Sequence, residues 1–166
     1  MLAAVVYIAL GLVWTGRSLL AVIADPQYYD PVTTIDWIAV WTYSLGFILI
    51  ATAVPLLARD ARAGRLLSGL AWVVATAALL AALANGLADG VGIESWGSLY
   101  IVGSLTTALG LIAVGAVLWS RKRPTHALVV VLWLAGFAMH TLGLGFLVLV
   151  GSIIAINAGR TAAAPA

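Results

Sequence analysis

Long apolar runs, separated by short polar segments, are the feature that most constrains how this chain can fold. Residues 2–24, 36–58, 66–88 and 97–119 form four such runs, and a fifth, 127–156, is longer. A helix of about 20 apolar residues crosses the roughly 30 Å hydrocarbon core of a membrane. None of the runs alternates with the period of a barrel strand. We therefore expect an all-α integral membrane protein, a compact bundle of five transmembrane helices.

The overall composition agrees with these runs. Of the 166 residues, 64% are apolar and 8% are charged, whereas a soluble domain has about 45–50% and about 25%. A soluble domain of this length has too little interior to bury so many apolar side chains. We expect one helical-bundle domain over residues 1–160, followed by a flexible tail over residues 161–166.

The fifth run, 127–156, has two interpretations. As one helix its 30 residues would be about 45 Å long, which exceeds the hydrocarbon thickness even for a tilted helix. Gly143 and Gly145 lie near its middle and permit a kink or a turn. We expect a single long helix, because a re-entrant turn must be shielded from lipid by protein. The alternative is a hairpin that returns Arg160 to the side where the fifth run begins.

The charges of the connecting segments alternate along the chain. The first and third connections carry only acidic charges, and the second and fourth are mainly basic, with Arg59, Arg62, Arg65, Arg121, Lys122 and Arg123. Basic loops stay in the cytoplasm. We therefore expect loops 59–65 and 120–125, with the N-terminus, on the cytoplasmic side of the cytoplasmic membrane, and loops 25–36 and 89–96 on the other side.

Several kinds of chemistry are excluded by composition. The chain has no cysteine, so disulfides, thiol catalysis and thiolate metal sites are absent. His126 and His140 would lie about 21 Å apart on one helix, too far to share a metal ion. We expect no metal and no cofactor. The basic residues lie in short loops, where they indicate membrane orientation rather than nucleic acid binding.

Polar residues within the runs gather at one depth, toward the acidic loops. Small residues on one face of run 66–88 lead to Asn85 and Asp89, which places this face in the bundle centre. We expect an outward-opening pocket whose ligand-binding residues are Arg17, Asn85, His140, Trp14, Trp41, Tyr43 and Thr107. An inward Arg17 would contact Asp36, Asp89, carbonyl groups or a bound anion. In the alternative, Arg17 extends to the outer head groups.

Three classes of function fit these features. The first, which we expect, is a non-catalytic protein of the membrane, a subunit or scaffold or a lipid-binding protein, whose partners are membrane lipid, further copies of itself or a larger membrane complex. The second is an enzyme that acts on a lipid or isoprenoid head group, with His140 as catalytic acid or base and Arg17 holding an anion. The third is a small oligomeric transporter or channel.

Overall fold

The chain folds into a bundle of helices. The computed structural model describes residues 1–24, 26, 31–62 and 64–163, and no strand occurs within these ranges. The helices are α1 (Leu2–Ala24), α2 (Thr34–Asp60), α3 (Gly64–Ala88), η1 (Glu94–Trp96), α4 (Gly97–Ser120), α5 (Pro124–Ala138), η2 (His140–Leu142) and α6 (Phe146–Ala163).

The lengths of the helices and the apolar exterior of the bundle are compatible with a membrane protein. Helices α1, α2 and α3 and the segment Glu94–Ser120 are long and apolar enough to cross one, while α5 and α6 are apolar but shorter. Large apolar side chains such as Leu12, Leu79, Leu105 and Val131 are exposed on the outside of the bundle. An apolar exterior of this extent is unusual on a soluble protein.

The first four expected helices are present, and their ends differ from the expected ones by at most two residues. The expectation of a single fifth helix over 127–156 is wrong: this stretch contains α5, η2 and α6, which turn back on one another as in the hairpin alternative. Helix α6 continues through Ala163, into the expected tail, while residues 164–166 lie outside the described residues. Asp25 and Asp30 of the first acidic loop also lie outside them.

The hairpin turns where its backbone meets α1. Gly143 has a φ of +82°, a left-handed conformation that favours glycine. At Gly145, a Cβ atom would overlap the carbonyl oxygen of Trp14, so only glycine permits this approach to α1. The Ser18 hydroxyl of α1 donates to the His140 carbonyl (2.7 Å) and accepts from the Gly145 amide (3.0 Å). Ser18 thus satisfies backbone groups on both sides of the turn.

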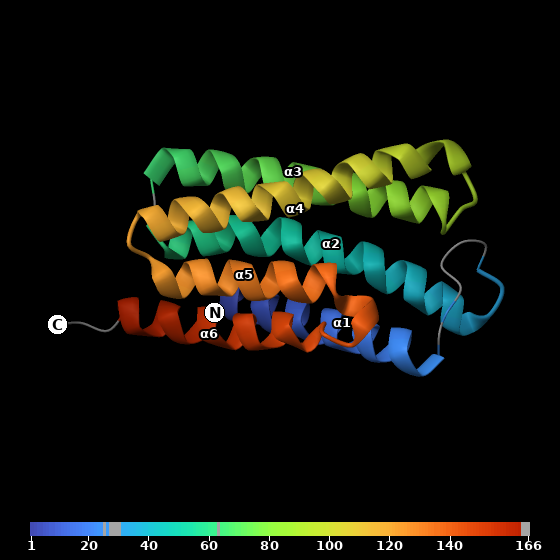
Figure 1. The fold of residues 1–166 in the computed structure, drawn as a ribbon, viewed down its shortest axis with the longest axis horizontal. Coiled ribbons are helices and arrows are strands. Elements are labelled where there is room, and N and C mark those ends of the chain that lie inside the picture. The colour runs from blue at the N-terminus through green and yellow to red at the C-terminus, as the bar shows by residue number, and fades with distance from the viewer. Residues whose placement is uncertain (25, 27–30, 63, 164–166) are drawn as a thin grey trace.

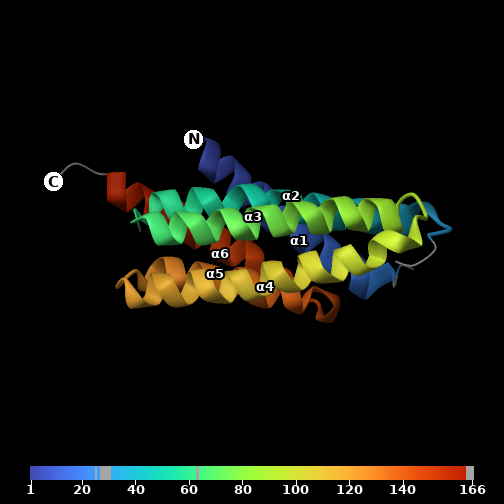
Figure 2. The same cartoon turned by 90° about the horizontal axis from the view of Figure 1, so that it is seen from above.

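The helices form a closed ring in which the hairpin occupies only half of the length. Each of the helices α1 to α6 packs against the next one along the chain, and α6 packs against α1. Figure 1 shows that α5 and α6 extend from the end that holds the α2–α3 and α4–α5 connections to the middle of the bundle. Of the described helices from α1 to α6, only α1, α2, α3 and α4 continue beyond the turn toward the end that holds the α3–α4 connection, as Figure 2 shows from above.

Aromatic rings fill the centre of the ring, and small residues bring the helices close. Trp14 is fully buried, and its ring contacts Phe47 and Phe137 edge-on. Between α3 and α4, a Cβ atom at Gly103 or Gly110 would overlap atoms of α3. These glycines meet Val74, Ala77 and Ala81, which lie beside the small-residue face expected from the sequence. The alanines of that expected face, Ala71, Ala75, Ala78 and Ala82, are buried within the chain as well.

The Ser18→Ala variant tests whether this hydroxyl holds the turn. Its loss leaves the Gly145 amide without a partner and the His140 carbonyl with only the Gly143 amide, which should lower the free energy of unfolding by about 1–3 kcal/mol. Ser104→Ala is the matched control, because the Ser104 hydroxyl donates only to the Tyr100 carbonyl of its own helix. Thermal unfolding in detergent measures both variants, and equal losses of stability would contradict this role of Ser18.

Candidate functional site: a polar pocket above the hairpin turn

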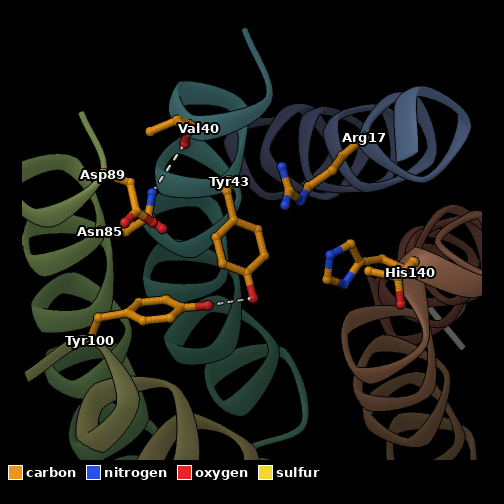
Figure 3. A pocket seen from close by; sticks show the side chains of 8 residues that line it. Arg17, Val40, Tyr43, Asn85, Asp89, Tyr100 and His140 are labelled. Carbon is orange, nitrogen blue, oxygen red and sulfur yellow. Dashed lines mark hydrogen bonds between the residues drawn. The ribbon is translucent and has the colours of Figure 1, made fainter. Parts of the chain in front are cut away.

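A pocket of about 170 Å³ lies between the four long helices and the turn of the hairpin. It is lined by Arg17, Val40, Tyr43, Asn85, Asp89, Tyr100, His140 and Thr141. Figure 3 shows that side chains from α1, α2, α3, α4 and the hairpin turn converge on it. Its position follows from the half-length hairpin, because α5 and α6 do not extend into this half of the bundle (Figure 1).

Arg17 enters the pocket because it lies on the buried face of α1. Tyr7, Leu10 and Trp14 precede it at helical spacing, and all of them are fully or almost fully buried. The side chain of Arg17 is 4% exposed, and its Nη1 donates to the Ala39 carbonyl. Packing of the apolar face of α1 therefore carries a guanidinium into the interior.

Aromatic rings support this guanidinium. Its Cζ atom lies 4.0 Å from the centroid of the Tyr43 ring, which is a cation–π contact. The hydroxyl of Tyr100 donates to that of Tyr43 at 3.0 Å, which joins α4 to α2 across the pocket. Figure 3 shows the Tyr43 ring between Tyr100 and the side of the pocket that holds Arg17. The two tyrosines thus form a wall with polar hydroxyls.

Asn85 connects α3 to α2 at the same level. Its Nδ2 donates to the Val40 carbonyl (3.2 Å) and to the Ser44 hydroxyl (3.0 Å). At 3% exposure, a side-chain amide needs such partners, because an unsatisfied buried polar group is costly. Asn85 therefore fixes the spacing of two walls of the pocket.

His140 contributes an imidazole from the hairpin turn. Its Nδ1 lies 2.9 Å from the Phe137 carbonyl oxygen, and its ring centroid lies 5.4 Å from those of Trp14 and Tyr43. A carbonyl oxygen only accepts hydrogen bonds, so we assign the proton of the neutral ring to Nδ1. The Nε2 atom of this tautomer is an acceptor, as a catalytic base requires.

Asp89 gives the pocket a carboxyl group as well as a guanidinium. It follows the last residue of α3 and is half-buried. Burial raises the pKa of this carboxyl above its ordinary value. A carboxylate at the C-terminal end of a helix is also disfavoured by the helix dipole. The pocket thus holds one positively charged and one acidic side chain.

The structure brings together four of the seven residues expected to bind a ligand: Arg17, Tyr43, Asn85 and His140 line the pocket. Trp14 lies against His140 but is fully buried in the core. Trp41 and Thr107 lie elsewhere. Since Val40 and Tyr43 face the pocket, Trp41 projects from another face of α2, where it is 50% exposed. The hydroxyl of Thr107 donates to Gly103 within α4, in the contact with α3.

Sequence reasoning missed Val40, Asp89, Tyr100 and Thr141 as pocket residues. For Asp89 the signal was available, since it ends the small-residue face of α3 that also carries Asn85. Thr141 lies in the turn. It was not expected to line the pocket because residues 127–156 were expected to form one continuous helix.

The described residues contain no group of three His, Cys, Asp or Glu side chains that could hold a metal ion. The polar groups of the pocket are suited instead to hydrogen bonding and to charge pairing with a small polar group. Comparisons with protein families, curated proteins and solved structures find no match to this chain.

The variant Asp89→Asn tests the cost of the half-buried carboxyl. Because its pKa is raised in the folded protein, the folded state binds more protons than the unfolded chain above the ordinary value of 3.8. Stability therefore falls as the pH rises through this range. The variant should be more stable than the natural chain at neutral pH, and the difference should shrink toward about pH 4.

Thermal unfolding in detergent at a series of pH values measures this difference. Glu94→Gln is the control, because Glu94 is an exposed acid at the same end of the molecule. A less stable Asp89→Asn protein at neutral pH would contradict the assignment.

Proposed function

We propose that this chain is a non-catalytic membrane protein that binds the polar head group of a lipid in the pocket above its hairpin turn. The observation that carries the proposal is the position of Arg17, which is buried at 4% exposure within an apolar helix and lines a pocket. Charged groups inside a membrane are costly, and they mark ligand or ion sites when they face a cavity rather than lipid.

The proposed orientation follows from the charges of the connections. The basic segments 59–65 and 120–125 belong in the cytoplasm, and the acidic segments 25–36 and 89–96 on the other side. Arg160 then returns to the cytoplasmic side with α6. The half of the bundle beyond the hairpin turn ends at the α3–α4 connection (Figure 1). In this orientation the pocket, which Asp89 lines beside that connection, opens in the extracytoplasmic half of the cytoplasmic membrane.

The size and charge of the pocket favour a head group over a whole lipid. A volume of about 170 Å³ is below the 300–1,000 Å³ typical of sites that enclose larger ligands. Arg17 suits a phosphate or carboxylate group, and Asp89 suits an ammonium group. In the described part of the chain, α1 and α4 are not among the packed helix pairs. This supports entry of a lipid between them, with its chains remaining in the bilayer.

An enzyme acting on the head group is the second candidate, and it rests on the acceptor Nε2 atom of His140. Binding requires Arg17, whereas catalysis requires in addition a proton transfer by His140. The two candidates therefore predict different effects of His140→Gln. For an enzyme this change abolishes turnover, whereas for a binding protein it leaves lipid binding intact and there is no turnover.

An assembly of several copies, or with other subunits, stays a prediction. The small residues that motivated it are buried within the chain. On α4, Gly103 lies against α3, and the alanines of the expected face of α3 are also buried, namely Ala71, Ala75, Ala78 and Ala82. Because these residues are used within the chain, they are not available to contact another subunit. We therefore favour a lipid-binding protein over a scaffold. A transporter or channel would need a path through the aromatic core around Trp14, which is fully buried.

The variant Arg17→Gln tests the proposed function. We expect its affinity for phosphatidylethanolamine, which carries both a phosphate and an ammonium group, to fall about tenfold, because a charge-assisted hydrogen bond is lost. Native mass spectrometry of the purified protein, titrated with this lipid in detergent, measures the bound fraction. Arg65→Gln removes an equal charge from an exposed position at the other end of the bundle and serves as the control. Equal lipid binding by both variants would overturn the proposal.

A further inference from the structure

A second hollow lies at the opposite, basic end of the bundle. It has a volume of about 580 Å³ and lies between the start of α5 and the second half of α6. Lys122, Arg123 and His126 line it from the α4–α5 connection and the first turn of α5, and Asn157 lines it from α6. It shares no residue with the pocket above the hairpin turn.

The first turn of α5 provides hydrogen-bond donors at this hollow. The helix begins with Pro124, and no side chain caps its N-terminus. The first amides of a helix have no partner within the helix, and its dipole favours negative charge at this end. The Thr125 and His126 residues that follow Pro124 line the hollow. The free amides and the helix dipole at this end of α5 therefore favour binding of an anion.

His126 is an independent indication of a ligand. Its side chain is 8% exposed, and it lines the hollow. Within the described part of the chain, no hydrogen bond joins its ring to another residue. The ring nitrogens are not among the fully buried polar atoms that lack a partner, so they remain accessible to a hydrogen-bond partner. An oxygen atom of an anion in the hollow would supply one for the imidazole.

In the described part of the chain, Lys122 and Arg123 line the hollow and no acidic residue does, although Asp60 interacts electrostatically with His126. A neighbouring hollow at the same end, near Arg59 and Arg160, differs in this respect. There Asp60 lies 3.5 Å from Arg59 and offsets its charge. Of the two hollows, the one at the start of α5 is better suited to an anion.

We propose that the hollow at the start of α5 is a phosphate-binding site. Lys122, Arg123, the first amides of α5 and the His126 ring would contact the phosphate oxygens. In the orientation proposed above, the site lies where the cytoplasmic leaflet meets water. The phosphate then belongs either to the head group of an anionic phospholipid of that leaflet or to a soluble phosphate compound. The site does not depend on lipid binding in the other pocket.

The experiment measures the binding of phosphatidylglycerol and of inorganic phosphate to the full chain in a neutral detergent, by native mass spectrometry and by thermal shift. We expect Arg123→Gln and Lys122→Gln each to weaken binding about tenfold, because each removes a charge-assisted contact to phosphate. Both side chains are exposed, so folding should survive these changes. His126→Gln should weaken binding as well.

Arg65→Gln is the matched control, because it removes one positive charge from the same end of the bundle without lining the hollow. The site is supported if Arg65→Gln binds like the natural chain. Binding of phosphatidylglycerol alone then assigns a lipid head group, and binding of inorganic phosphate as well assigns a soluble phosphate compound. Absence of binding, or equal weakening by Arg65→Gln and Arg123→Gln, overturns the proposal. These results do not test the proposed function, which rests on the binding of phosphatidylethanolamine by Arg17 in the other pocket.

Discussion

The hydrogen bonds of Ser18 to the turn between α5 and α6 are the contact on which the arrangement of the bundle depends. In a bundle that spans a membrane as proposed, a non-helical turn in the middle leaves backbone groups that hydrocarbon cannot satisfy, so protein must supply their partners. Ser18 accepts from the Gly145 amide and donates to the His140 carbonyl, and the absence of a side chain at Gly145 lets α1 approach. The turn is thereby held in the middle of the bundle.

The pocket is a consequence of that turn. The half of the bundle that contains α5 and α6 has six helices around its centre. Because the hairpin ends halfway, only α1, α2, α3 and α4 surround the centre of the other half. The centre of this half is lined by Arg17, Tyr43, Tyr100, Asn85 and Asp89, with His140 on the turn as its floor. A second set of polar groups lies at the basic end, at the start of α5. The two sites are thus separated along the bundle, and both include residues of the hairpin segment.

The four long helices could be predicted from the sequence because short polar or charged segments separate the apolar runs. Asp36 begins one such run and Arg59 ends it, and the structure extends α2 by only two residues on either side. The turn within 127–156 has no such boundary. Its polar residues are His140 and Thr141, neither of which marks a helix end as a charged residue does, and its polar partner, Ser18, lies more than a hundred residues earlier in the chain. Only Gly143 and Gly145 indicated it, and both are compatible with a continuous helix.

Depth along the helices predicted the level of the pocket, but a residue lines it only where its face of the helix also points inward. Arg17, Asn85 and His140 were expected at one level, and they line one pocket. Trp41 was placed with them by depth alone, although a shift of one residue rotates a side chain by about 100° around the helix. Tyr100 was not among the expected pocket residues, because its role in the wall depends on the position of Tyr43 on another helix.

Side-specific labelling of single cysteines tests the hairpin most directly, because the natural chain has no cysteine. Arg121→Cys, Gly159→Cys and Glu94→Cys would each be introduced alone into the chain in intact cells or oriented vesicles. A thiol reagent that does not cross membranes would then be added from one side. The account predicts that positions 121 and 159 react from the same side and position 94 from the opposite side. Labelling of position 159 from the same side as position 94 would contradict it, because α5 and α6 would then cross the membrane as one helix.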